Sequence, residues 1–169
     1  GVVFGQLADW KGQPIPWDGP GPGRFCNVVD YASILRIEGQ LFHLSHLECT
    51  LGGMVLTPLS QSPDGRFSVG RPALVDQSEY WGGHVSCAGE HTPWNTHLGS
   101  EEYEANARNA DLSGRMFPSE MVVATKHPFD WSFNNAHQAY GKPVSPYHYG
   151  WSPEVEVRDA HGTTKVVNH

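Results

Sequence analysis

The chain has 169 residues, enough for one domain with a hydrophobic core, and a net charge of -7 from 18 acidic and 11 basic residues. Its Lys and Arg residues form no cluster, which excludes the basic face that nucleic-acid binding requires. No apolar run reaches the roughly 18 residues of a membrane span, so we expect none. The many glycines, prolines and aromatic residues favour short strands joined by tight turns, and therefore predict an all-β fold.

Residues 1–29 predict an extended arm rich in glycine and proline. Prolines and glycines recur through residues 13–25, so neither a helix nor a central strand can run through this segment. We expect the arm to lay Trp10, Trp17 and Phe25 over a neighbouring surface.

Three later segments alternate apolar and polar residues on both sides of a turn signal, which is typical of β-hairpins. The segments are 33–48, turning at Glu38-Gly39; 53–69, turning at Pro63-Asp64-Gly65; and 154–169, turning at His161-Gly162. Because the last hairpin has no polar tail after it, the sequence also suggests a piece of something larger.

Two further elements are predicted between these hairpins. Residues 121–127 read as a strand. Residues 100–112 read as a helix, in which Ser100 caps the first turn and three acidic residues face the positive end of the dipole.

The three cysteines form an odd set, which in an oxidising compartment suggests one disulfide and one free thiol. We predict that Cys26 pairs with Cys49 and that Cys87 stays free, because Cys87 alone lies among other ligand-type residues. The alternative is three ordinary buried thiols.

Residues 87–103 gather a thiol, two imidazoles and three carboxylates. A thiolate suits a transition metal and adjacent carboxylates suit calcium, so this segment is a candidate mixed-metal loop. The simpler readings are a buried Cys87 and a solvated first helical turn at Glu101 and Glu102. Three histidines around Cys87 also allow a copper or zinc site: His84, His91 and His97.

The runs Cys87-Ala88-Gly89, Thr92-Pro93-Trp94, Thr96-His97-Leu98 and Glu101-Glu102 resemble the signature loop of the PhoX family of secreted alkaline phosphatases. In that family a cysteine precedes Thr-Pro-Trp-Gly-Thr and a Glu-Glu pair. Segment 33–48 is similar to the family's first-blade hairpin and segment 149–162 to a later Tyr-Gly-Trp strand, so the resemblance covers roughly residues 30–167. It implies that residues 30–169 form the two or three N-terminal blades of a β-propeller with long loops. A C-terminal remainder or a partner chain would complete the propeller.

The resemblance also implies a metal centre that hydrolyses phosphate monoesters outside the cytoplasm, in an extracellular or periplasmic location. Cys87 would bind Fe³⁺ and Glu101 and Glu102 would bind Ca²⁺, with His46 and Glu48 as further candidate ligands. Trp94 would anchor the loop by packing beneath it.

Asn95 and Ser100 depart from the family pattern, and the candidate metal ligands Cys87, Glu101 and Glu102 keep it. The rival functions are a non-catalytic, calcium-stabilised surface protein and a copper-binding protein.

Overall fold

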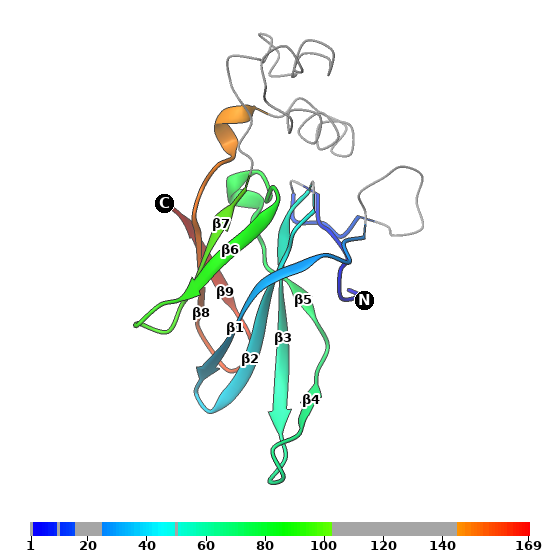
Figure 1. Ribbon diagram of the computed structural model, residues 1–169, viewed down its shortest axis with the longest axis vertical. Helices are drawn as coiled ribbons and strands as arrows, with labels where there is room; N and C mark the ends of the chain where they lie inside the picture. The colour runs from blue at the N-terminus through cyan, green and yellow to red at the C-terminus, as the bar shows by residue number, and fades with distance from the viewer. Residues whose placement is uncertain (1, 10, 16–24, 50, 103–144) are drawn as a thin grey trace.

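The computed structural model describes residues 2–9, 11–15, 25–49, 51–102 and 145–169 (Figure 1). The regular elements of this part are β-strands and two short 3₁₀-helices, and the strands form two antiparallel sheets. The predicted all-β fold is therefore confirmed. The described residues form neither a closed barrel nor a propeller. They include no helix that is long and apolar enough to cross a membrane.

The first sheet contains five strands, with β1–β4 adjacent in chain order and β5 paired to β3: β1 (Val29–Ile37), β2 (Gln40–Leu47), β3 (Gly53–Gln61), β4 (Phe67–Val69) and β5 (Ala73–Leu74). The turn between β1 and β2 places Glu38 at φ 51° and Gly39 at φ 87°. Two successive left-handed residues suit a two-residue hairpin turn, so the hairpin predicted at Glu38-Gly39 is confirmed. Gly65, in the second predicted turn, also has a positive φ of 85°.

The second sheet contains four strands in chain order: β6 (Ser86–His91), β7 (His97–Glu101), β8 (Pro153–Val157) and β9 (Thr164–Asn168). The β8–β9 hairpin confirms the third predicted hairpin, with Gly162 at φ 85° in its turn. The 3₁₀-helices η1 (Ser78–Tyr80) and η3 (Pro146–His148) lie near one end of this sheet (Figure 1).

Two predictions for the middle of the chain need comment. Ser100 and Glu101 belong to β7, so the predicted start of a helix at Ser100 is wrong. The backbone there is held by pairing with β6, which overrides the local capping signal. The rest of that helix, residues 103–112, and the strand predicted at 121–127 lie outside the described residues.

The main core lies between the two sheets and consists almost entirely of aliphatic side chains from both: Leu35, Phe42, Leu44, Met54, Leu56, Val75, Val155, Val157 and Val166. The sheets approach closely at Gly89 and Gly99, which face each other in the β6–β7 register. A Cβ on Gly99 would lie 2.8 Å from Met54 Cε, and one on Gly89 would lie 2.4 Å from Tyr31 Cδ1. Glycine is therefore required where β6 and β7 pack against the first sheet.

A second core cluster joins the N-terminal arm to the first sheet. Leu7 and Ile15 are buried in it, together with the disulfide between Cys26 and Cys49. This is the pairing that the sequence predicts, and Cys87 is a free thiol. Phe25 is half exposed, and Trp10 and Trp17 lie outside the described residues.

Candidate metal centre

The segment predicted as a loop from Cys87 onward is a β-hairpin. Strands β6 and β7 pair in register from Gly89 to His91, and a β-bulge lies between Ser86 and Gly89. The bulge contains Cys87 and changes the direction of its side chain relative to a regular strand. The bulge therefore sets the direction of the Cys87 side chain. It lies at the opposite end of the hairpin from the Thr92–Thr96 turn.

The turn itself carries the Thr-Pro-Trp part of the motif. Thr92 and Thr96 close it through a backbone hydrogen bond of 3.0 Å and a side-chain hydrogen bond of 2.7 Å. Trp94 is 67% exposed and donates from Nε1 to Glu154 at 2.6 Å. The prediction that Trp94 packs beneath the loop is therefore wrong, because Trp94 lies at the tip of the turn with its ring largely exposed.

Cys87 lies among carboxylates that come from both sheets. Its thiol donates to Oδ2 of Asp30 at 2.9 Å. One potential ligand atom from each of Asp30, Glu48 and Cys87 lies within 4.8 Å of the other two. Glu102 lies close enough to Cys87 and Glu48 to raise the pKa of both. We call Asp30, Glu48, Cys87 and Glu102 the acid–thiol cluster.

The cluster concentrates negative charge around a protonated thiol. The hydrogen bond to Asp30, followed by burial and the nearby Glu102 carboxylate, raises the pKa of Cys87 to about 12. Burial, and then the neighbouring charges of Asp30 and Glu102, raise the pKa of Glu48, although its hydrogen bond to Cys87 opposes them. A bound cation would remove this repulsion and favour the ionised form of every member.

The structure places the two adjacent glutamates in different environments. The Glu101 carboxylate accepts backbone N–H bonds from His84 at 2.8 Å, Gly150 at 2.7 Å and Trp151 at 3.4 Å. Burial raises the pKa of Glu101 to about 7, against the opposing effect of these hydrogen bonds. Glu101 thus connects the end of β7 to two other segments, whereas Glu102, one residue further, belongs to the acid–thiol cluster.

His46 lies behind the cluster and is fully buried. Its Nδ1 hydrogen-bonds to the backbone oxygen of Cys87, and its Nε2 lies 2.6 Å from Nε2 of His97. The His97 Nδ1 in turn bonds to the hydroxyl of Ser33. Both ring nitrogens of His46 are therefore engaged within the protein, and this residue positions Cys87 through its carbonyl.

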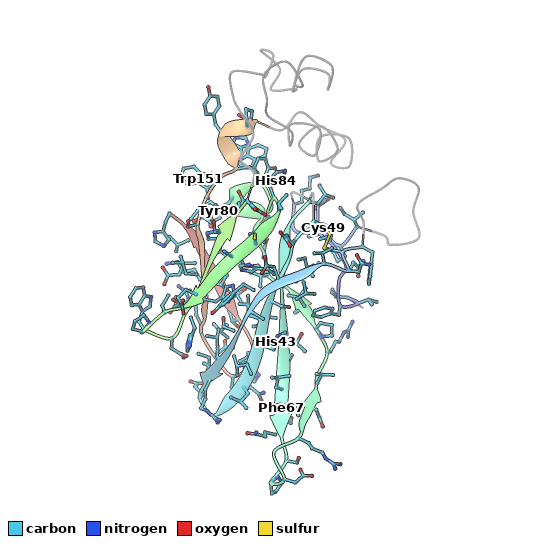
Figure 2. All side chains as sticks on the ribbon, in the orientation of Figure 1. His43, Cys49, Phe67, Tyr80, His84 and Trp151 are labelled. Atoms are coloured by element: carbon cyan, nitrogen blue, oxygen red, sulfur yellow. A yellow bond between two sulfur atoms is a disulfide. The ribbon has the colours of Figure 1, made fainter. Side chains whose placement is uncertain are left out.

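Of the three histidines in the copper or zinc alternative, His84 and His91 do not lie with His97 around Cys87. His84 is buried near Glu101, and Figure 2 shows it at the upper end of the second sheet. His91 is exposed and bonds to Asn95 at 3.1 Å. In the described ranges, the one group of three or more His, Cys, Asp or Glu with close ligand atoms is Asp30, Glu48 and Cys87.

Sequence reasoning missed Asp30, which precedes the first alternating strand by three residues and is separated from Cys87 by 57. Its short-range context contains no ligand motif, so only the packing of β1 beside β6 reveals it. Comparisons with protein-family models, curated proteins and solved structures found no match for this chain.

Proposed function

We propose that the acid–thiol cluster binds a metal ion. The observation that carries the proposal is the convergence of Asp30, Glu48 and Cys87, from three separate segments, to within 4.8 Å of one another. The raised pKa values of Glu48 and Cys87 support it in part: burial is the main cause for Glu48 and the hydrogen bond to Asp30 for Cys87, and the charges of Asp30 and Glu102 add to both.

The donor set fits two kinds of ion. The carboxylates of Asp30, Glu48 and Glu102 offer the oxygen ligands that Ca²⁺ prefers. The sulfur of Cys87 suits a transition metal such as Fe³⁺, which would displace the thiol proton on binding. We therefore propose Ca²⁺ as the principal ion and Fe³⁺ as the ion that takes the thiolate.

The resemblance to the PhoX family supports a hydrolytic role for this centre. Bound metal ions there would act as Lewis acids on a phosphate monoester. Asp30, Glu48, Cys87 and Glu102 would hold the ions. The two sheets would be the first blades of a β-propeller, and a C-terminal remainder or a partner chain would supply the other ligands.

The disulfide between Cys26 and Cys49 supports an extracellular or periplasmic location, because such bonds persist in oxidising compartments. A second candidate function is a purely structural calcium site. One observation favours it, since the ligands come from both sheets and a bound ion would join them without any chemistry.

Metal analysis and titration test the binding proposal. Elemental analysis of the native protein should find calcium, with iron if the centre is catalytic; copper would contradict the proposal. After treatment with a chelator, calorimetric titration with Ca²⁺ should give saturable binding that Asp30→Asn and Glu48→Gln each weaken. Glu90→Gln is the matched control, since Glu90 is an exposed acid on the same hairpin as Cys87. Equal affinity in all four proteins would refute the site.

The thiol ligand has its own test. Co²⁺ bound to a thiolate gives a charge-transfer absorption that a carboxylate site does not, so Cys87→Ser should abolish this band. Hydrolysis of p-nitrophenyl phosphate by the metal-loaded native protein distinguishes the enzyme from the structural site. Turnover that survives Cys87→Ala would remove Cys87 from the mechanism.

A further inference from the structure

A cleft lined by aromatic side chains, none of which belongs to the acid–thiol cluster, lies at the end of the second sheet that carries the 3₁₀-helices. We call it the aromatic cleft, and it has a volume of about 260 Å³. Figure 2 labels two residues of its wall, Tyr80 and Trp151. The side chains that matter for its chemistry are Glu79, Tyr80, Trp81, Tyr147, His148 and Trp151.

Three aromatic side chains of the cleft are partly or largely exposed. Trp81 is 38% exposed, Trp151 is 40% exposed and Tyr147 is 74% exposed. Trp81 directly follows η1, Tyr147 lies in η3 and Trp151 precedes β8, so the fold brings together rings from two distant parts of the sequence. Aromatic rings gathered around a hollow, rather than scattered singly, are typical of a binding site.

Several contacts hold the rings in place without a ligand. Trp81 has a left-handed backbone with φ 68°, a costly conformation for a bulky residue. Its carbonyl accepts the Tyr149 hydroxyl at 3.0 Å, and its ring stacks on His148 with a centroid distance of 4.4 Å and an angle of 13°. Tyr80 donates its hydroxyl to the backbone oxygen of Val166 at 3.4 Å. This order reduces the entropy that ligand binding would otherwise cost.

The charge of the wall selects the class of ligand. Glu79 is the acidic residue of the wall, and no Lys or Arg stands among the described residues that line the cleft. The chain as a whole carries a charge of -7. These charges disfavour an anion. A cation above aromatic rings is stabilised by their quadrupoles, and quaternary ammonium groups are bound by such clusters of rings.

We propose that the aromatic cleft binds a small organic cation with a quaternary ammonium group. The trimethylammonium group would contact the rings of Tyr80, Tyr147 and Trp151, and Glu79 would supply the complementary charge. The volume lies just below the roughly 300 to 1,000 Å³ of pockets for drug-sized ligands, which suits a molecule of the size of choline. The proposal is independent of the metal centre.

Titration with choline chloride, followed by tryptophan fluorescence and calorimetry, tests the proposal. Saturable binding is expected, and 3,3-dimethylbutan-1-ol, which has the same shape without the charge, should bind roughly tenfold more weakly. Phosphocholine separates a free ligand from a lipid headgroup. Because the described wall has no basic residue for the phosphate, choline should bind at least as well as phosphocholine.

Variants locate the site. Trp151→Ala should weaken choline binding roughly tenfold, and Glu79→Gln, which removes charge but little volume, roughly threefold. Trp94→Ala is the matched control, since Trp94 is an exposed tryptophan on the β6–β7 turn, and it should leave binding unchanged. Equal binding of choline and the neutral alcohol would overturn the proposal, as would absence of saturation, an unaffected Glu79→Gln variant, or binding of neutral sugars in place of choline.

Discussion

The chain of hydrogen bonds between the sheets gives a prediction about acid stability. The carbonyl of Cys87 can only accept, so His46 donates from Nδ1 and its Nε2 is a bare acceptor. His97 must then donate from Nε2 and accept the Ser33 hydroxyl at Nδ1. Every hydrogen-bonding position of both rings is filled when both histidines are neutral, so an added proton would bring a charge into a buried, fully bonded chain.

The size of the effect follows from the pKa of His97. Burial, and then the neighbouring His46, lower this pKa from 6.5 to about 3. Above pH 6.5 His97 is neutral in the folded and unfolded states, so it makes no pH-dependent contribution. Below pH 6.5 the unfolded chain binds a proton that the folded protein does not, which destabilises the folded state by about 1.4 kcal/mol per pH unit. Between pH 6.5 and pH 5 the loss is about 2 kcal/mol.

The comparison of wild type with His97→Gln isolates this contribution. Urea unfolding should be measured from pH 7.5 to pH 5 with a chelator present, so that metal binding does not contribute. At pH 7.5 the variant should be less stable by roughly 1 to 3 kcal/mol, because it loses buried hydrogen bonds. At pH 5 this difference should have shrunk by about 2 kcal/mol. His161→Gln, at an exposed turn histidine, is the control and should keep the wild-type slope. Parallel pH profiles for wild type and His97→Gln would refute the reasoning.

Three further predictions concern the disulfide, the contact between the sheets and the free thiol. Reduction of the disulfide, whose cysteines are 23 residues apart, should lower the free energy of unfolding by about 3 kcal/mol, and coincident urea curves with and without dithiothreitol would contradict this. Gly99→Ala should lower the free energy of unfolding in the same assay by roughly 1 to 3 kcal/mol, because the new Cβ would lie 2.8 Å from Met54 Cε and 2.9 Å from His46 Nε2. An unchanged urea midpoint would show that the sheets can separate at little cost. At pH 8, iodoacetamide should alkylate Cys87 of the folded, chelator-treated protein at least roughly a hundredfold more slowly than Cys87 of the unfolded chain, because folding raises the pKa of this thiol to about 12. Asp30→Asn should increase the rate in the folded protein. Equal rates in folded and unfolded protein would disprove the raised pKa.

Local signals predicted the hairpins well. The turn at Glu38-Gly39 is marked by Gly39, which adopts a left-handed backbone without steric cost, and flanking alternation sets which face is buried. Residues 87–91 contain no large apolar side chain, so the β6–β7 hairpin carries no local strand signal. Its strands are held by pairing with each other and with β8, which a local pattern does not report.

The candidate centre was predictable only in part, for a related reason. The motif identified Cys87 as a candidate ligand, and the end of β7 at Glu101 explains why Glu101 and Glu102 separate, since successive residues of an extended chain point to opposite faces. The contact of Cys87 with Asp30 spans 57 residues and depends on how the two sheets pack. A ligand set drawn from both sheets is therefore visible only in three dimensions.

Because the proposed ligands lie on both sheets, metal binding would also stabilise the fold. Asp30 and Glu48 belong to the first sheet, on β1 and just after β2, whereas Cys87 and Glu102 belong to the second, on β6 and just after β7. An ion held by all four residues would bind the folded protein and not the unfolded chain. At a calcium concentration a hundred times the dissociation constant, it would stabilise the folded state by about 2.7 kcal/mol.

The sign of a single substitution then depends on calcium. Without the ion, Asp30→Asn removes one of the charges that raise the pKa of Glu48, so the variant should match or exceed wild type in stability. With calcium, the variant loses a ligand and wild type should be the more stable protein. Thermal unfolding of both proteins, with calcium and with chelator, measures this reversal. An ion ligand should show a substitution effect that differs with and without calcium. If Asp30→Asn instead shifts the unfolding temperature equally in both conditions, Asp30 contributes to packing alone and the ion does not join the sheets.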